Sequence, residues 1–234
     1  MATIVITGAS SGIGFETALS LSAARHHIIA IARSADGLKK LKDTARRGQH
    51  GTTIHPLVFD ITRGDYEKDL IPIIAEQLGQ VDALINNAGL LMNKPFADTT
   101  VADFSAMIEV NLLGHVQMIQ HLLPLMRPGS HIVNIGSMGG VQGSVKFPGL
   151  AAYSASKAAL HTLTECLAME LQETGVKVNC LALGSAQTEM LVQAFPGYMS
   201  PVTARDMGAY IGDFALTGQR LFNGKILPVA VTTP

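Results

Sequence analysis

The chain has 234 residues, of which 47% are hydrophobic and 15% are charged. This composition is ordinary for a soluble enzyme, and the length suits one large α/β domain with a buried core over residues 1–234. The 17 lysines and arginines nearly balance the 18 aspartates and glutamates, and no basic run or acidic tail occurs. The sequence therefore argues against nucleic acid or membrane partners and favours a small-molecule partner.

The N-terminus and the cysteines indicate the compartment. Residues 1–6 begin an apolar strand without a basic region or cleavage site, and no apolar run approaches the length of a membrane span. We therefore expect a cytoplasmic protein. Only Cys166 and Cys180 are present, and we expect both to be reduced core residues. The histidines are scattered without metal-binding spacing, so no metal site is expected.

Short apolar runs rich in Val, Ile and Leu alternate with longer amphipathic stretches along the chain. This alternation predicts a doubly wound parallel sheet with helices on both faces and ligands at the carboxyl ends of the strands. The predicted strands lie near residues 3–6, 28–31, 54–59, 83–86, 131–135, 177–182 and 225–230. The predicted helices lie near residues 13–24, 36–46, 66–78, 101–126, 152–173 and 204–215. No repeat or linker divides the chain.

The first predicted strand ends in a glycine-rich segment, Thr7 to Gly14, which opens the first predicted helix. Gly8 allows a tight turn, Gly12 allows the backbone to approach a pyrophosphate, and Gly14 allows close packing. Backbone N–H groups and the dipole at the helix start favour a phosphate. A turn that serves packing alone is the alternative, but the strand-to-helix context favours a dinucleotide cofactor.

Tyr153 and Lys157 lie four residues apart in a predicted helix and therefore share one face. A free tyrosine titrates near pH ~10, so a cation that favours the phenolate would make it a useful acid or base at cellular pH. A surface pair in which the lysine stem lies along the helix is the alternative. The motifs elsewhere in the chain favour the chemical interpretation.

The motifs together resemble the short-chain dehydrogenase/reductase family. They are Thr7-Gly8-x-x-x-Gly12-x-Gly14, Asn86-Asn87-Ala88-Gly89, Asn111, Ser137 and Tyr153-x-x-x-Lys157. The resemblance extends through Thr188 and, more weakly, to the last strand. It implies a single-domain Rossmann-type sheet of about seven strands and hydride transfer between a nicotinamide cofactor and a carbonyl or alcohol. It also implies a homodimer or homotetramer, formed through the helices near 101–126 and 152–173.

The resemblance implies roles for four catalytic residues. Tyr153 would donate its proton to the carbonyl oxygen, and Lys157 would lower the pKa of Tyr153 and bind the nicotinamide ribose. Ser137 would hydrogen-bond the substrate oxygen, or would merely cap a turn. Asn111 would distort its helix and help hold a relay water, or would be an incidental polar residue. The predicted cofactor-binding residues are Gly8, Ser10, Ser11, Gly12, Ile13, Gly14, Arg33, Asp60, Ile61, Asn87, Ala88, Gly89, Tyr153, Lys157, Gly184 and Thr188.

The end of the second strand bears on the choice of cofactor. An acidic residue there would bind the ribose 2′-hydroxyl, but the chain has Ala32-Arg33-Ser34. The Arg33 guanidinium suits a 2′-phosphate, so we expect NADP(H) over NAD(H), with a surface position for Arg33 as the alternative. Asp60, at the end of the third strand, would bind the adenine amino group or would cap a helix.

The substrate end departs from the family pattern. The segment from Ser137 to Tyr153 is longer than usual, the lid near 188–203 is shorter, and Leu183 replaces the proline before Gly184. We expect an open pocket, or one completed by another subunit. The residues expected to face this pocket, or to pack the lid, are Met138, Val141, Val145, Phe147, Met190, Leu191, Phe195, Tyr198 and Met199. They favour a small apolar ketone, aldehyde or secondary alcohol.

Other functions fit the sequence less well. Ser137 lacks the glycine two residues before it that a nucleophile elbow needs, which argues against a hydrolase. A sugar-nucleotide epimerase would need a larger C-terminal region. The main alternative is a nonenzymatic NADP(H)-binding sensor or regulatory protein on the same fold.

Overall fold

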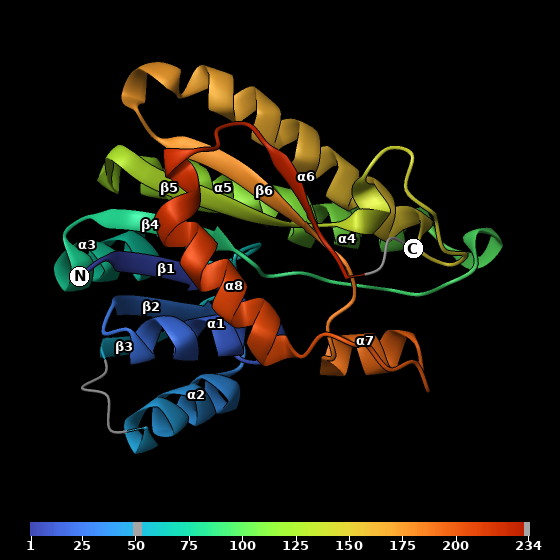
Figure 1. Ribbon diagram of the computed structural model, residues 1–234, viewed down its shortest axis with the longest axis horizontal. Coiled ribbons are helices and arrows are strands. Elements are labelled where there is room, and N and C mark those ends of the chain that lie inside the picture. Colours follow the sequence, from blue (N-terminus) through green and yellow to red (C-terminus); the bar gives the residue numbers. More distant parts are fainter. Residues whose placement is uncertain (49–52, 232–234) are drawn as a thin grey trace.

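The computed structural model describes residues 1–48 and 53–231. In this part of the chain, a seven-stranded parallel sheet has the order β3-β2-β1-β4-β5-β6-β7 (Figure 1). The strands are β1 (Thr3–Thr7), β2 (His27–Ala32), β3 (Thr53–Val58), β4 (Val81–Asn86), β5 (Met126–Ser137), β6 (Lys177–Leu183) and β7 (Ile226–Val229). Because the chain winds outward from β1 to β3 and then returns beside β1, the junction of β1 and β4 is a topological switch point, where such sheets bind ligands. The predicted Rossmann-type fold is confirmed.

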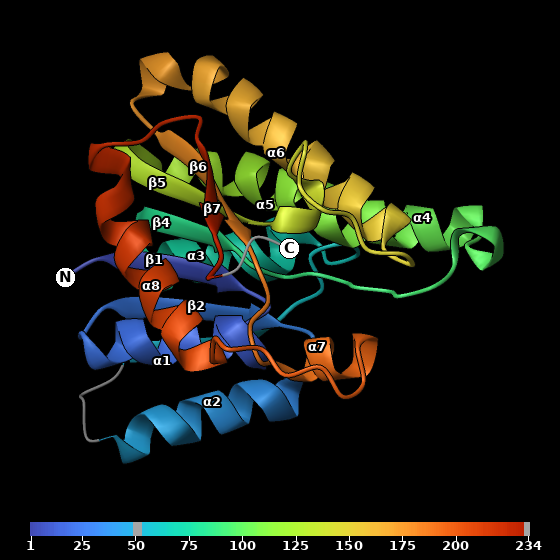
Figure 2. The same ribbon diagram turned by 45° about the vertical axis from the view of Figure 1, so that its right-hand side comes forward.

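Most strand residues are apolar because both faces of the sheet are covered. Helices α1 (Gly12–Ala23), α2 (Ala35–Arg47) and α8 (Ala204–Thr217) pack on one face. Helices α3 (Ile71–Leu78), α5 (Gly114–Leu122) and α6 (Ala151–Glu170) pack on the other. Figures 1 and 2 show α8 crossing the sheet beside α1. Two hydrophobic cores result, one on each face.

The helix predicted over 101–126 is interrupted. It consists of α4 (Val101–Ile108), a π-helical turn over Glu109–Leu113, α5 and a 3₁₀ turn over Leu123–Leu125. Pro124 has no N–H group to continue the hydrogen bonding, and β5 already begins at Met126. The predicted helical segment is thus confirmed to within one residue at its end, whereas its π-helical turn and its 3₁₀ end were not predicted. The π-helical turn places Asn111 in the interior.

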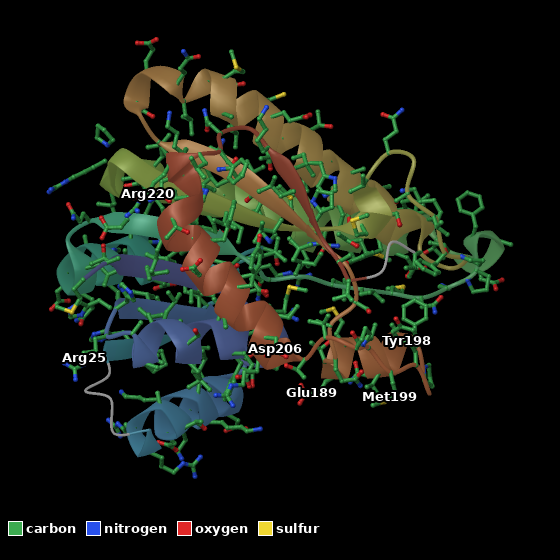
Figure 3. The ribbon with its side chains drawn as sticks, in the orientation of Figure 1. Arg25, Glu189, Tyr198, Met199, Asp206 and Arg220 are labelled. Carbon is green, nitrogen blue, oxygen red and sulfur yellow. The ribbon has the colours of Figure 1, made fainter. Side chains whose placement is uncertain are left out.

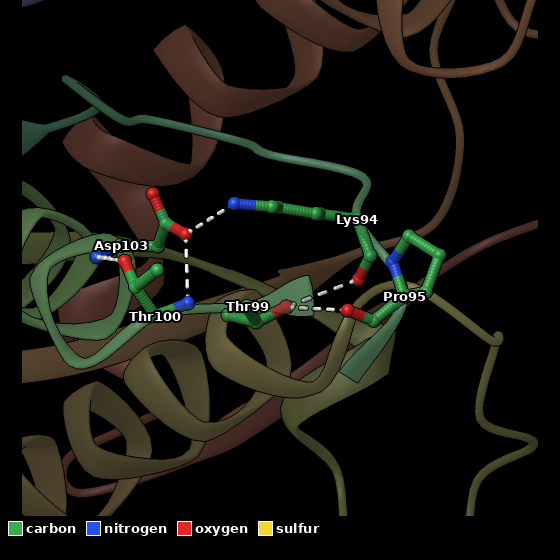
Figure 4. Close-up of polar contacts among 5 residues, drawn as sticks. All are labelled: Lys94, Pro95, Thr99, Thr100 and Asp103. Atoms are coloured by element: carbon green, nitrogen blue, oxygen red, sulfur yellow. Dashed lines mark hydrogen bonds and ion pairs between the residues drawn. The ribbon is translucent and has the colours of Figure 1, made fainter. Parts of the chain in front are cut away.

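The start of α4 is held by a capping box (Figure 4). The Thr100 hydroxyl accepts a hydrogen bond from the Asp103 N–H, and the Asp103 carboxylate accepts one from the Thr100 N–H. Lys94 forms an ion pair with the same carboxylate at 2.7 Å. The Lys94 N–H also bonds the Gly149 carbonyl at 3.0 Å, which connects this loop to the segment before α6.

The lid contains a short helix that the sequence analysis did not predict, α7 (Glu189–Ala194). The Thr188 hydroxyl caps it by accepting the Leu191 N–H at 3.2 Å. At the base of the lid, Gln187 pairs with Thr203 in an isolated parallel bridge. The predicted lid near 188–203 is therefore partly helical.

Two sequence expectations about the surface and the interior can be compared with the structure. Cys180 is buried as expected, whereas Cys166 is exposed on α6, so the prediction of a core position for Cys166 was wrong. Within residues 1–48 and 53–231, no helix is long and apolar enough to cross a membrane.

Candidate active site

A cavity of about 420 Å³ opens at the carboxyl ends of the central strands. It brings together nearly all the residues predicted for the site. The predicted residues that line it are Gly8, Ser10, Ser11, Gly12, Ile13, Arg33, Asp60, Ile61, Asn87, Ala88, Gly89, Ser137, Tyr153, Lys157, Gly184 and Thr188. Gly14 and Asn111 lie behind its wall and act through packing and hydrogen bonds.

The glycine segment is shaped by close contacts. A Cβ atom on Gly14 would lie 2.5 Å from the Gly8 carbonyl oxygen, and one on Gly8 would lie 2.7 Å from the Ala88 Cα. Gly8 and Gly12 have φ values of 68° and 56°, a region that favours glycine. A Cβ on Gly12 would meet only the Thr188 side chain, at 3.4 Å. Because Gly12 has no side chain, its backbone is accessible from the cavity. A pyrophosphate of a dinucleotide could approach the backbone closely there.

Thr7 and Asn87 join this turn to the end of β4. The Thr7 hydroxyl accepts hydrogen bonds from the N–H groups of Asn87 and Ala88, both at 3.0 Å. The Asn87 side-chain amide donates to the carbonyl oxygens of Thr7 and Gly8, at 3.0 and 3.2 Å. No role was predicted for the Thr7 hydroxyl. Its position at the carboxyl end of the first strand, where the predicted site lies, could have indicated one.

Tyr153 and Lys157 lie in the first two turns of α6, and Ser137 ends β5. The Lys157 ammonium donates to the Ile135 carbonyl at 2.8 Å and lies 5.9 Å from the centroid of the Tyr153 ring. Burial lowers the pKa of Lys157 to about 8. Burial also raises the pKa of Tyr153, an effect that hydrogen bonding by Ser137 partly offsets. In the chain alone the Tyr153 pKa is thus raised, and its lowering by Lys157 stays a prediction.

Asn111 fixes the start of α6 from inside. Its side-chain oxygen accepts the Leu90 N–H at 2.7 Å, and its amide donates to the Leu90 carbonyl and the Ser156 hydroxyl, both at 2.9 Å. Ser156 in turn donates to the Tyr153 carbonyl at 2.7 Å. The side chain of Asn111 is fully buried and bridges two segments of the site. Ser156 was not predicted as a site residue, although it lies inside the Tyr153-x-x-x-Lys157 motif.

Three neutral groups surround the Lys157 ammonium. Burial lowers the pKa of His115 to about 3 and that of His161 to about 4, and the Lys157 charge adds to both shifts. Burial raises the pKa of the Cys180 thiol to about 12, although the Lys157 charge opposes this shift. Lys157 is therefore the cation of this cluster at neutral pH.

The far end of the cavity carries Arg33 and Asp60. Arg33 is exposed, in line with the surface position left open by the sequence. Asp60 accepts hydrogen bonds at Oδ1 from the Thr62 N–H and hydroxyl, at 2.9 and 2.7 Å. Although partial burial opposes the shift, these bonds and the charges of Arg33 and Arg63 lower the Asp60 pKa. Asp60 caps a turn rather than the helix considered as an alternative.

Of the nine residues expected at the substrate end, the cavity is lined by Met190 and Leu191. The other seven do not line it, and packing of the lid was the alternative for these residues. Met138 is buried beneath the site. Phe147 packs edge-on against Phe195 with ring centroids 6.5 Å apart. Figure 3 shows Tyr198 and Met199 on the lid segment beside α7, where Met199 is 74% exposed.

Comparison with known proteins identifies the family. A sequence profile described as short chain dehydrogenase matches residues 2–198. An uncharacterized oxidoreductase of Staphylococcus saprophyticus is 34% identical over 190 residues, which cover 80% of this chain and 79% of that protein. The chain belongs to the short-chain dehydrogenase/reductase family. Dehydrogenase/reductase SDR family member 7B of Mus musculus is also 34% identical, over 197 residues that cover 82% of this chain and 60% of that protein.

Solved structures support the same assignment for this short-chain dehydrogenase. A short chain dehydrogenase from Burkholderia cenocepacia, in complex with NADP, has a TM-score of 0.87 and 26% sequence identity. The match covers 98% of this chain and 96% of that one. The chain is therefore a nicotinamide-dependent dehydrogenase or reductase. Its glycine segment and cavity fit the cofactor class.

Proposed function

We propose that this enzyme transfers a hydride between NADP(H) and the carbonyl or secondary alcohol of a small apolar substrate. The observation that carries the proposal is that Ser137, Tyr153 and Lys157 line the same cavity as the glycine segment. Proton-handling groups and the cofactor cradle thus share one space. The bound nicotinamide would supply or accept the hydride.

The chain's own residues would handle the proton and the developing charge. Ser137 accepts the Gly139 N–H at 3.1 Å and hydrogen-bonds the Tyr153 side chain, so a substrate oxygen bound beside Tyr153 would also be within reach of the Ser137 hydroxyl. Tyr153 has a raised pKa and is protonated at neutral pH, as a general acid for carbonyl reduction must be. Lys157 is held by the Ile135 carbonyl at the inner wall, where its charge can stabilise the phenolate after proton transfer.

The preference for NADP(H) rests on Arg33. It lines the cavity at the end of β2, where its neighbours Ala32 and Ser34 carry no charge. A guanidinium can bind a 2′-phosphate through two parallel hydrogen bonds. Asp60 is fixed through Oδ1 and would use its other oxygen to accept the adenine amino group.

The apolar substrate class rests on apolar side chains of the cavity wall. Leu91, Val110, Met190 and Leu191 line the same cavity as Tyr153. These side chains would bind hydrocarbon surface around a single polar group. The homodimer or homotetramer remains a further proposal, which light scattering of the purified protein tests.

The test is a panel of carbonyls and alcohols assayed with NADPH and NADH. We expect turnover with apolar ketones or aldehydes, and loss of at least about 100-fold in kcat for Tyr153→Phe, because general acid catalysis contributes roughly 10²–10⁴-fold. Full activity of Tyr153→Phe would refute the mechanism. Cofactor binding without turnover across the panel would favour the sensor.

The cofactor preference has its own test. Removing a hydrogen bond to a charged group costs about 1.5–3 kcal/mol, so Arg33→Ala should raise KM for NADPH by roughly 10–100-fold and leave KM for NADH nearly unchanged. Arg63→Ala is the matched control, because Arg63 is also exposed near Asp60 but does not line the cavity. A lower KM for NADH than for NADPH in the wild type would contradict the preference.

A further inference from the structure

We propose that Lys146 is a positioning residue that holds the segment after Ser137 in its active shape. The proposal rests on the function proposed above, because it assigns Lys146 a part in that reaction. Lys146 lies in the long segment between Ser137 and Tyr153. It acts through the backbone rather than on substrate.

The Lys146 ammonium is bound by three acceptors of its own segment. It donates to the Gly139 carbonyl at 2.8 Å, the Val141 carbonyl at 2.5 Å and the Ser144 hydroxyl at 2.8 Å. The Ser144 hydroxyl also lies 2.6 Å from the Met138 carbonyl. An ammonium has three N–H donors, so each one has a partner here. The side chain therefore gathers residues 138–146 into a closed turn.

Gly139 connects this turn to Ser137. Its carbonyl accepts from Lys146, and its N–H donates to the Ser137 hydroxyl oxygen at 3.1 Å. One peptide segment thus links the ammonium to the group that would stabilise developing charge. A shift of Gly139 would change the direction of the Ser137 hydroxyl, and such donors work only when they are placed in advance.

The opposite side of the same segment lies against α6. A Cβ on Gly140 would be 2.7 Å from the Ala158 nitrogen, and one on Gly139 would be 3.0 Å from the Ser154 hydroxyl. The contact at Gly140 is with backbone and leaves no room for a side chain, whereas the contact at Gly139 is with a side chain. Two consecutive glycines have wide conformational freedom, so the segment needs support from more than one side. The helix supplies it from the inside, and the exposed Lys146 supplies it from the solvent side.

The same contacts argue against a direct role for Lys146 in binding an acidic substrate. All three of its donors have acceptors in the turn, and Lys146 does not line the cavity. Recruiting it to a carboxylate would break the bonds that hold Gly139. Its charge is therefore structural, which agrees with an apolar substrate.

The test compares Lys146→Met with Lys146→Arg in the full-length enzyme. Removing an oxyanion donor costs roughly 10²–10³-fold in kcat, and misplacing one should cost part of that, so we expect kcat of K146M to fall about tenfold. KM for NADPH should stay within about twofold of wild type, because the cofactor cradle is untouched. K146R retains the charge and the donors and should recover most of kcat. Lys225→Met is the control, since Lys225 is exposed just before β7, and it should keep wild-type kcat.

A double-mutant cycle separates positioning from general stability. If Lys146 acts through Ser137, adding K146M to Ser137→Ala should change kcat by less than about twofold. If K146M fails to fold, Lys146→Gln, which keeps one neutral donor group, takes its place in the cycle. Wild-type kcat in K146M, or a full tenfold loss in the Ser137→Ala background, would overturn the proposal. A wild type without turnover on any substrate would overturn the proposed function itself, which is a different result.

Discussion

Buried histidines should make this enzyme sensitive to mild acid. His115, His131 and His161 are at most 6% exposed. Burial lowers their pKa values from 6.5 to about 3, 4 and 4, respectively. Each is therefore neutral in the folded protein, whereas in the unfolded chain it would take up a proton below pH ~6.5.

The sign and size of the effect follow from this difference. Because the folded state binds fewer protons, stability is fully present above pH ~6.5 and falls as the pH drops toward the folded pKa values. Each histidine lowers the free energy of unfolding by about 1.36 kcal/mol per pH unit, hence by about 2 kcal/mol between pH ~6.5 and ~5. The three together cost about 6 kcal/mol, a large part of the roughly 5–15 kcal/mol that stabilises a typical domain.

His131 offers a variant that isolates one of these contributions. Its Nδ1 lies 3.1 Å from the Ala215 carbonyl, and its Nε2 lies 2.9 Å from the side-chain nitrogen of Asn179. A glutamine also supplies one donor and one acceptor but does not titrate. In urea unfolding at pH ~7 and ~5, His131→Gln should lose about 2 kcal/mol less stability than wild type. An unfolding free energy of the wild type that does not change between these pH values would refute the reasoning, as would equal losses in both proteins.

Three further changes test the site. Gly14→Ala places a Cβ 2.5 Å from the Gly8 carbonyl oxygen, so it should lower the free energy of unfolding in urea by about 1–3 kcal/mol and weaken NADPH binding. An unchanged unfolding free energy and an unchanged NADPH affinity would contradict the packing role of Gly14. Because the Lys157 pKa is about 8 in the chain alone, kcat/KM for carbonyl reduction should fall as the pH rises through about 8. Arginine keeps its charge at this pH, so the same fall of kcat/KM in Lys157→Arg would show that Lys157 does not cause it. Asn111→Leu leaves the Leu90 N–H without its acceptor and should cost about 1–3 kcal/mol, with faster hydrogen exchange at that amide; wild-type exchange would disprove the bridge.

The sheet could be predicted from the sequence because its strands are short apolar runs bounded by polar residues. β1 and β6 were placed within one residue of their ends, since both faces of each strand are buried and no competing period exists. The long helical stretch before β5 was harder. Its apolar residues continue through Pro124 into a strand, so hydrophobicity alone does not show where the helix ends.

The cofactor half of the site was predictable for a related reason. Gly8, Gly12 and Gly14 are required by backbone conformation and close approach, which leave a visible spacing in the sequence. The bridging role of Asn111 was not visible, because it depends on Leu90 and Ser156, two partners that are distant in sequence. A polar residue in an apolar helix signals that some partner exists but not which one.

The substrate half depends on contacts that have no sequence period. Phe147 is apolar and close to α6, so it was expected to face the pocket or to pack the lid, and it packs on Phe195 of the lid. Asn93 donates to the Ala194 carbonyl at 2.8 Å and fastens the end of α7 to a third loop. The Lys94 N–H bond to the Gly149 carbonyl joins this loop to the segment before α6, so the three loops contact one another. A residue's distance from Tyr153 along the chain therefore says little about its place in the pocket, and substrate specificity in this enzyme must be traced through the contacts that join the three loops.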